Sequence, residues 1–451
     1  MTRTVRVRYP PSPTGFCHVG TARMALLNFL FAKKHGGAIV FRVEDTDEER
    51  SKKEYEDDII ESFTWLGLSW DEFYRQSERT KVYQEAIKDL IDADKAYVSE
   101  EESKKNPGEK VHVVRLRNPG TRVTFVDIIR GEISFDTAEL GDFAIARSLE
   151  APLYHLSVVV DDEAMGITHI IRGEDHISNT PRQILIQEAL GYSRPQYAHY
   201  PLHLAMDRSK LSKRKGDVAI RDYREKGYLS GALRNYLANL GWTPPSEREI
   251  LTLDEMIVEF ELTDVHKSGA VFDIEKLRWF NREYLLRLPE STFQKESMVT
   301  LRKDLAERKV KWDEKVASSL VHILRERIST WGDIHTLVVE GEFDYFFMNP
   351  RIDPELIPGK NSDVETAAKH LTKIKGMLSA LSVKEFANAE SVKASVWEYA
   401  TKEGRGAVLW PLRYILTGRE RSPDPFIVAA AIGKEAVLER IDIAREILQR
   451  P

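Results

Sequence analysis

Residues 5–43 carry a strand, a helix and a second strand in immediate succession, and this order constrains the fold more than any other feature. Apolar residues alternate with arginines over residues 5–9, which is the period of a strand. From Thr21 onward the apolar residues fall on one helical face, and residues 38–43 form a second strand-like run. A strand, helix and strand joined so closely predict a parallel sheet with a right-handed crossover, and hence an α/β fold.

Polar segments follow both predicted strands. Residues 10–20 follow the first strand, and Glu44-Asp-Thr-Asp47 follows the second. Ligands of open parallel sheets bind beyond the carboxyl ends of the strands, so we expect a binding site there. In the first segment, His18-Val-Gly-Thr21 leads into the helix, whose N-terminal N–H groups attract anionic oxygens, while Gly20 lets a nucleotide approach the backbone. Taken alone, such a turn is more often structural.

A basic loop, Lys210-Leu-Ser-Lys213-Arg214, follows a strand predicted over residues 201–206. Two lysines three residues apart can neutralise the charge that develops on a pyrophosphate leaving group. A lone cluster of this kind is more commonly a solvated charge run. Together, the histidine–glycine turn and the basic loop favour a site for a nucleoside triphosphate.

Composition excludes several classes of protein. The chain has 66 Lys and Arg against 72 Asp and Glu, a net charge of -6, which excludes a uniformly basic nucleic-acid coat protein but permits a local basic patch. The one cysteine, Cys17, can form neither an internal disulfide nor a cysteine-rich zinc site. No uncharged apolar run is long enough to cross a bilayer and no signal peptide is visible. We therefore expect a cytoplasmic protein without a membrane partner.

Six motifs resemble those of the bacterial-type glutamyl-tRNA synthetases of class I. They are Pro11-Ser-Pro-Thr-Gly15, His18-Val-Gly-Thr21, Glu44-Asp-Thr-Asp47, Arg172-Gly-Glu-Asp-His176, Asn179-Thr-Pro-Arg182 and Lys210-Leu-Ser-Lys-Arg214. Their order and spacing match from about residue 4 to about residue 290. The helical C-terminal third resembles the anticodon-binding region of the family more loosely.

The resemblance implies a Rossmann-like parallel-sheet catalytic domain with a small inserted connective domain, followed by an all-helical stem-contact and anticodon-binding region. The expected boundaries are 1–94 and 151–219 for the two halves of the catalytic domain, 95–150 for the insertion, 220–289 for the stem-contact domain and 290–451 for the anticodon-binding domain.

The same resemblance implies ATP-dependent ligation of L-glutamate to the 3′ end of glutamate tRNA through a glutamyl adenylate. The residues that match the family's catalytic positions are His18, Lys210 and Lys213. Those that match its ATP-binding positions are His18, Gly20, Asp175, Lys210, Leu211, Ser212 and Lys213. Mg²⁺ is expected on the phosphates. No metal-binding motif is visible, and zinc is not expected.

Glutamate offers one ammonium and two carboxylates, so a selective pocket needs an acidic group and more than one donor. Glu44 suits the ammonium, and Arg8 and Arg172 can each fork onto a carboxylate, while Ser12 and Tyr154 add hydroxyls. All five match glutamate-binding positions of the family. Taken alone, each arginine is more often part of a surface ion pair, and the same applies to Glu44 after a strand.

The expected tRNA contacts rest on fewer residues. Arg327, in Leu324-Arg-Glu-Arg327, aligns with the arginine by which discriminating family members read the third anticodon base, and Arg413 matches a second anticodon-side position. An arginine can tell C from U because the two pyrimidines present opposite hydrogen-bonding groups. The alternative is an ordinary solvated helix arginine. Tyr236 and Trp242 fall in a segment resembling the stem-contact helices, but core aromatics are the simpler reading.

Two features depart from the family pattern. The segment 95–150 is shorter than expected and lacks the cysteine cluster through which some members bind zinc. Leu153 stands where the family tends to carry threonine.

The leading hypothesis is a monomeric, discriminating glutamate–tRNA ligase. Two alternatives stay open: an enzyme that also glutamylates glutamine tRNA, and a non-catalytic RNA-binding paralogue. A small-molecule nucleotidylyltransferase, a relative that glutamylates a modified tRNA base and a glutaminyl enzyme fit less well, because the chain carries a long helical C-terminal region.

Overall fold

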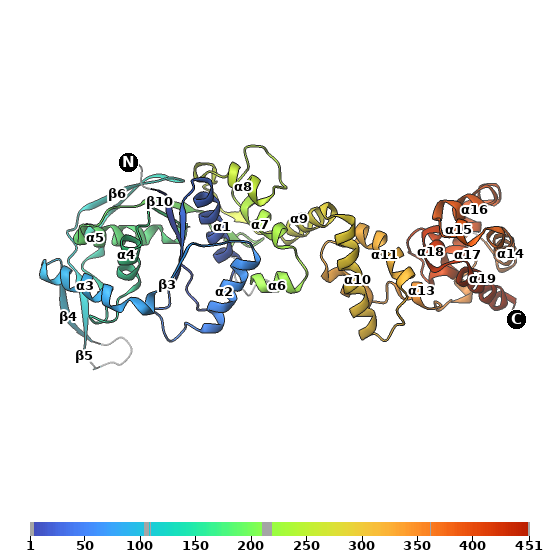
Figure 1. The fold of residues 1–451 in the computed structure, drawn as a ribbon, viewed down its shortest axis with the longest axis horizontal. Helices are drawn as coiled ribbons and strands as arrows, with labels where there is room; N and C mark the ends of the chain where they lie inside the picture. The colour runs from blue at the N-terminus through green and yellow to red at the C-terminus, as the bar shows by residue number, and fades with distance from the viewer. Residues whose placement is uncertain (1–3, 103–107, 109, 210–218, 361, 450–451) are drawn as a thin grey trace. The chain divides into compact units, whose positions relative to one another are not determined.

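The computed structural model describes every residue except 1–3, 103–107, 109, 210–218, 361 and 450–451 (Figure 1). The chain forms two compact units, Met1–Tyr284 and Leu285–Pro451. The predicted loop Lys210-Leu-Ser-Lys213-Arg214 therefore lies outside the described residues.

The first unit is built on a parallel sheet. Its strands are β1 (Arg6–Tyr9), β2 (Ala38–Val43), β3 (Glu72–Arg75), β6 (Arg122–Asp127), β9 (His169–Gly173) and β10 (Gln196–Tyr200). Parallel pairing joins β1 to β2, β2 to β3, β9 to β10 and β10 to β6. A 2.9 Å backbone hydrogen bond from Thr168 N to Arg6 O brings β9 beside β1. Strand β1 therefore has β2 on one side and β9 on the other. The strand order reverses at β1, and such a switch point is where open parallel sheets bind ligands.

Helices cover this sheet, as Figure 1 shows. They are α1 (Val19–Lys34), α2 (Lys53–Trp65), α3 (Thr80–Asp92), α4 (Tyr154–Ala164) and α5 (Thr180–Leu190). The central helix α1 is buried along most of its length, which explains its apolar run. At the end of α5, Gly191 adopts φ 71°, the left-handed conformation that glycine tolerates best. The predicted α/β fold with a parallel sheet is confirmed.

The segment predicted as an insertion takes part in two sheets. β4 (Ala96–Glu102), β5 (Lys110–Leu116) and β8 (Phe143–Ala146) form an antiparallel sheet. β6 forms a hairpin with β7 (Gly131–Asp136) and also extends the main sheet beside β10. Alternation along β6 predicts a half-buried strand, but it does not indicate which sheet the strand joins.

The rest of the first unit is mostly helical. Its elements are β11 (His203–Leu204), α6 (Ile220–Glu225), α7 (Ser230–Asn239), α8 (Leu253–Glu259), β12 (Ala270–Val271) and α9 (Ile274–Arg287), which runs past the boundary. The strand expected over residues 201–206 is thus only the two residues of β11, paired with β12. Tyr236 and Trp242 are each 1% exposed, so both are core aromatics.

The second unit is helical throughout its described residues. Its helices are α10 (Glu290–Glu307), α11 (Glu314–Arg327), α12 (Gly332–Val339), α13 (Asp344–Phe347), α14 (Val364–Ala380), α15 (Val383–Phe386), α16 (Ala389–Glu403), α17 (Arg405–Thr417), α18 (Pro425–Ile432) and α19 (Lys434–Gln449). Among the described residues of the whole chain, no helix has the length and apolarity needed to cross a membrane.

Candidate active site

A cavity of about 430 Å³ opens at the carboxyl ends of β1, β2 and β9. Its lining includes Arg8, Ser12, His18, Gly20, Glu44, Tyr154, Arg172 and Asp175. These are all of the predicted ATP- and glutamate-binding residues that the structure describes. Lys210, Leu211, Ser212 and Lys213 lie outside the described residues, so their place in this site stays a prediction.

The helix α1 starts at the cavity, and His18 is its N-cap. The Nδ1 atom of His18 accepts a 3.0 Å hydrogen bond from the backbone N–H of Gly20. An accepting Nδ1 assigns the proton of the neutral ring to Nε2. A β-carbon added to Gly20 would lie 3.3 Å from the His18 ring, so glycine keeps this turn tight. The result is a helix N-terminus and an imidazole donor at one end of the cavity.

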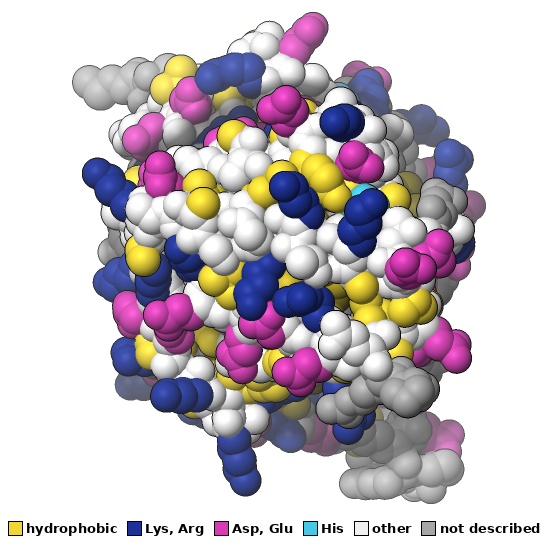
Figure 2. Space-filling view, turned by 90° about the vertical axis from the view of Figure 1, so that its right-hand side faces the viewer, with side chains coloured by type: hydrophobic (Ala, Val, Ile, Leu, Met, Phe, Trp, Pro, Cys, Tyr) yellow, Lys and Arg dark blue, Asp and Glu magenta, His cyan; other side chains and the backbone are white. Residues whose placement is uncertain are grey.

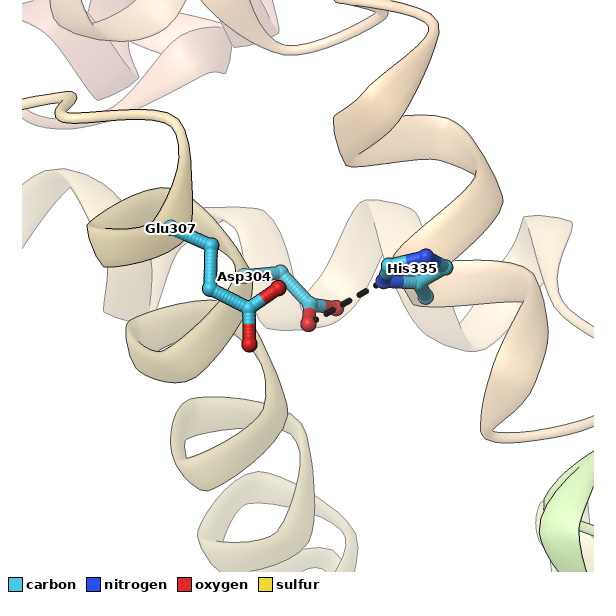
Figure 3. Close-up of side chains that lie close together, drawn as sticks. All are labelled: Asp304, Glu307 and His335. Carbon is cyan, nitrogen blue, oxygen red and sulfur yellow. Dashed lines mark ion pairs between the residues drawn. The ribbon is translucent and has the colours of Figure 1, made fainter.

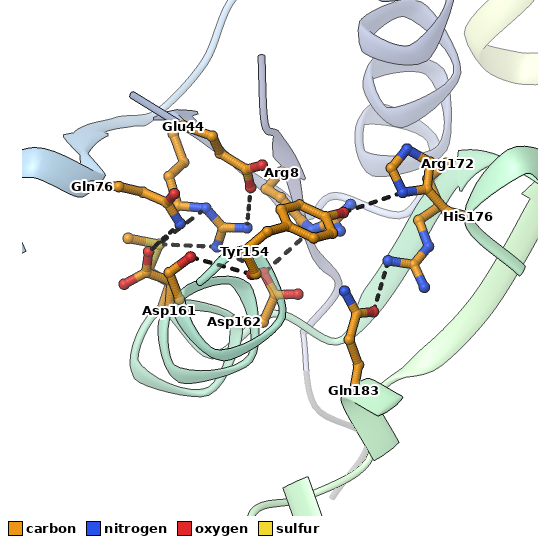
Figure 4. Close-up of polar contacts among 12 residues, drawn as sticks. Arg8, Glu44, Gln76, Tyr154, Asp161, Asp162, Arg172, His176 and Gln183 are labelled. Atoms are coloured by element: carbon orange, nitrogen blue, oxygen red, sulfur yellow. Dashed lines mark hydrogen bonds and ion pairs between the residues drawn. The ribbon is translucent and has the colours of Figure 1, made fainter. Parts of the chain in front are cut away.

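Buried charges tie β1, β2 and α4 together beneath the cavity (Figure 4). The Asp162 carboxylate accepts hydrogen bonds from Arg42 Nη1 at 2.7 Å and from Arg8 Nε at 3.3 Å. Arg42 Nη2 also donates to Glu44 at 3.0 Å. Asp161 lies on the other side of Arg42 and accepts from Tyr83 at 2.7 Å. Arg79 also pairs with Asp161, at 2.6 Å, so this network joins three arginines to three carboxylates, of which Glu44 is the third.

This network shifts the ionisation of the carboxyl groups. Burial opposes the charge on Asp162, but Arg8 and Arg42 outweigh it and hold the pKa of Asp162 below its usual value. For Glu44 burial prevails, and its pKa is raised although Arg42 acts in the opposite direction. A cation placed beside Glu44 would therefore be bound favourably, because it would relieve the cost of burying this carboxylate.

Arg172 projects from β9 and is fixed on three sides. Its guanidinium donates to Thr180 Oγ1 at 2.8 Å, to Gln183 Oε1 at 2.8 Å and to His199 Nε2 at 3.0 Å. His199 is held in turn by Asp127, whose Oδ2 lies 2.6 Å from Nδ1. Asp127 ends β6, so the inserted segment supports the site. Arg172 is 4% exposed and has no carboxylate among these partners, an arrangement suited to an anionic ligand.

Tyr154 stands at the start of α4, and Figure 4 shows its hydroxyl directed at the His176 ring. Its hydroxyl lies 3.1 Å from Nδ1 of His176. Burial, with help from Arg172, lowers the pKa of His176 to about 4, so this ring is neutral at pH 7. Burial also raises the pKa of Tyr154, which keeps its hydroxyl protonated.

Several residues of this site were missed by the sequence reasoning. Arg42, Asp161 and Asp162 carry the charge balance; their signal was a pair of aspartates directly after the apolar run Val158–Val160. His203 was also missed. It lines the cavity, is 7% exposed, and both its ring nitrogens have no hydrogen-bond partner among the described residues. Burial lowers the pKa of His203 well below its usual value, so the ring is neutral.

The second unit contains its own cavity, of about 820 Å³. Arg327 lines it and donates from Nη2 to Glu342 Oε2 at 3.0 Å, while the other oxygen of Glu342 pairs with Arg419. Arg413 is not among the described residues that line this cavity; its neighbour Tyr414 is. The structure therefore joins Arg327 to Arg419 through Glu342, and the anticodon contact of Arg413 stays a prediction.

Comparison with known proteins agrees with both units. Residues 4–105 and 98–279 match the family described as tRNA synthetases class I (E and Q), catalytic domain. Residues 278–445 match the family described as Anticodon binding domain. The fold and its cavity thus define a class I tRNA synthetase of the E and Q group with an appended anticodon-binding region.

Full-length relatives narrow the assignment. The glutamate–tRNA ligase of Aquifex aeolicus is 40% identical over 474 aligned positions, covering 97% of this chain and 98% of the relative. That of Desulforamulus reducens is 38% identical, covering 98% and 99%. The crystal structure of a glutamate tRNA ligase from Elizabethkingia meningosepticum in complex with its amino acid matches with a TM-score of 0.87 at 31% identity, covering 99% of this chain and 100% of that one. The chain belongs to the glutamate–tRNA ligase family.

Proposed function

We propose that this chain ligates L-glutamate to the 3′ end of glutamate tRNA with ATP, and that it discriminates against glutamine tRNA. One observation carries the proposal. A single cavity combines two buried arginines, a buried carboxylate and a histidine-capped helix N-terminus, which are the groups that an amino-dicarboxylate and a nucleotide require together.

Glutamate is bound by Arg8, Arg172 and Glu44. The Nη1 atom of Arg8 is buried and has no hydrogen-bond partner among the described residues. A substrate carboxylate would supply the missing partner, and a second carboxylate suits Arg172. The substrate ammonium is assigned to Glu44, whose ionised form it would stabilise. Ser12 and Tyr154 line the same cavity and supply hydroxyl donors.

ATP is assigned to the end of the cavity formed by His18, Gly20 and Asp175. Phosphate oxygens suit the N-terminus of α1 and the Nε2–H donor of His18. Lys210 and Lys213, on the sequence argument, neutralise the departing pyrophosphate, and Leu211 and Ser212 belong to the same ATP-binding loop. Mg²⁺ accompanies ATP as the counter-ion of its phosphates.

The reaction then needs no nucleophile from the protein. An oxygen of the glutamate α-carboxylate attacks the α-phosphorus of ATP, the bond to the β-phosphate oxygen breaks, and pyrophosphate leaves with the bonding electrons. The 2′-hydroxyl of the terminal ribose of tRNA attacks the carbonyl carbon of the adenylate and loses its proton, and AMP departs. The protein contributes positioning and electrostatic stabilisation.

Discrimination is assigned to Arg327 together with Glu342. The genetic code gives glutamate anticodons C as their third base and glutamine anticodons G, so the required choice is C against G. The pairing edge of guanine presents one acceptor beside two donors, and a carboxylate beside a guanidinium presents the same groups in the same order. These groups can therefore pair with C, whereas against G they place donor against donor and acceptor against acceptor. The 3.0 Å pair of Arg327 and Glu342 places these groups side by side at the cavity. Arg413 is assigned a secondary anticodon contact from the sequence alone.

The direct test is glutamate charging by the purified protein on unmodified glutamate and glutamine tRNA transcripts, with ATP and Mg²⁺. We expect charging of the glutamate transcript alone. Charging of both transcripts would overturn discrimination but keep the enzyme. Charging of neither, by folded protein on tRNA that a known ligase charges, would favour an RNA-binding paralogue. We also propose that the protein acts in the cytoplasm as a monomer. Sedimentation analysis of the purified protein tests the oligomeric state, and a particle of twice the chain mass would contradict the monomer.

A further inference from the structure

Three side chains converge in the second unit (Figure 3), and none of them is among the residues that line the cavity of Arg327. Asp304 and Glu307 lie on α10, and His335 lies on α12. One ligand atom from each residue lies within 4.8 Å of the others. The spacing of three residues places Asp304 and Glu307 on one face of α10. The packing of α12 against α10 then brings His335 beside them.

Asp304 is the unusual member of this cluster. Its side chain is only 5% exposed, and its Oδ1 atom lies 3.2 Å from Nδ1 of His335. Its other oxygen, Oδ2, is buried and has no hydrogen-bond partner among the described residues. A carboxylate oxygen buried without a partner is costly, and a bound cation is one means of satisfying it.

The donor set indicates which cation fits. One imidazole nitrogen and two carboxylate oxygens suit a borderline transition-metal ion, whereas Mg²⁺ and Ca²⁺ prefer oxygen ligands alone. Ligands bound to tetrahedral zinc at about 2.0–2.1 Å lie roughly 3.3 Å apart. The 3.2 Å between His335 Nδ1 and Asp304 Oδ1 matches this separation, and Glu307 comes within range by a rotation of its side chain.

We propose that Asp304, Glu307 and His335 bind one divalent transition-metal ion of the zinc type, which ties α10 to α12. The His335 side chain is 56% exposed, so the ion can enter from solvent and complete its coordination with water. The single cysteine of the chain excludes only a cysteine-rich zinc site, and the site proposed here contains no thiolate. The proposal is independent of the proposed ligase function.

Titration of ZnCl₂ into the full-length, metal-stripped protein in a calorimeter tests the site. We expect one binding event that Asp304→Asn and His335→Gln each weaken by about 100-fold or more. The matched control is Glu296→Gln, which removes an exposed carboxylate from the same helix and should leave the event intact. Equal zinc binding by all four proteins, or none by the wild type, would overturn the proposal.

Thermal melting separates a metal site from a simple ion pair and guards against a folding defect. We expect zinc to raise the melting temperature of the wild type and of Glu296→Gln but not of Asp304→Asn. Without metal, Asp304→Asn should melt no lower than the wild type, because a neutral amide replaces a buried carboxylate. A metal-free Asp304→Asn that melts lower, together with a wild type that zinc does not stabilise, would show that Asp304 serves only His335 and would overturn the proposal.

Discussion

The catalytic cavity and the cavity of the second unit both use arginines, but they hold them differently. Arg8, Arg42 and Arg172 are 2%, 0% and 4% exposed, and each has fixed polar partners. Arg327 and Arg419 have side chains that are 35% and 34% exposed, and they share one carboxylate, Glu342. A buried cation requires permanent partners, whereas a half-exposed cation is also solvated by water. Substitutions in the first cavity should therefore affect folding and chemistry together, and those in the second should affect selectivity alone.

The largest effect should come from Asp162→Asn. Removing this carboxylate leaves Arg8 and Arg42 without their shared partner in a buried place, which should lower the free energy of unfolding by about 3–5 kcal/mol. Denaturant unfolding measures it. Asp57→Asn is the control, since the Asp57 side chain is 61% exposed and pairs with the similarly exposed Lys53 at 2.8 Å. Equal losses in the two variants would remove the contrast between buried and exposed pairs.

Arg172→Lys should come next. A lysine cannot make the forked contacts to Thr180 and Gln183 or a bidentate bond to a carboxylate, so kcat/KM for glutamate should fall by about 10²–10³-fold. Tritiated glutamate charging at several glutamate concentrations measures this loss. Arg182→Lys serves as control, because Arg182 donates to the Ser178 carbonyl at 3.3 Å, lies over the Phe143 ring and is not among the described residues that line the cavity. A variant with unchanged kcat/KM would show that Arg172 does not contact the substrate.

In the second cavity, Arg327→Gln and Glu342→Gln should each reduce the preference for C over G at the third anticodon base by about 10–100-fold. Both variants should keep the wild-type free energy of unfolding to within about 0.5 kcal/mol. Charging of transcript pairs and denaturant unfolding supply the two readouts. If Glu342→Gln keeps full selectivity while Arg327→Gln loses it, Glu342 has no part in reading the base and Arg327 acts alone.

The smallest effect concerns pH. Burial lowers the pKa of His155 to about 4, from an ordinary value of 6.5, and Arg182 adds to this shift. Between these values the unfolded chain binds the proton and the folded chain does not, so folding stability falls as pH falls from about 6.5 toward 4. We expect His155→Gln to lessen the drop in melting temperature between pH 7 and pH 5 by about 2–4 °C. An unaltered pH profile would show that His155 is not held neutral by burial.

The sequence led to the fold and to the lining of the catalytic cavity for one physical reason. Arg8, Glu44 and Arg172 lie in or directly after parallel strands, and a parallel sheet brings those strand ends together. The charges beneath the cavity could not be placed this way. Asp162 meets Arg42 only because α4 packs on the sheet, and helical periodicity does not determine which partner a buried aspartate finds. The same limit applies to Glu342, whose position between two arginines depends on tertiary packing.

The most direct test of the account uses two glutamate tRNA transcripts that differ only in the third anticodon base, C or G. The purified wild-type protein is given ATP, Mg²⁺ and labelled glutamate, and kcat/KM is measured for each transcript. The account predicts ATP-dependent glutamylation with C preferred by about 10–100-fold. Equal charging of both transcripts would contradict the role of Arg327 and Glu342, and absence of charging would contradict the proposed function itself.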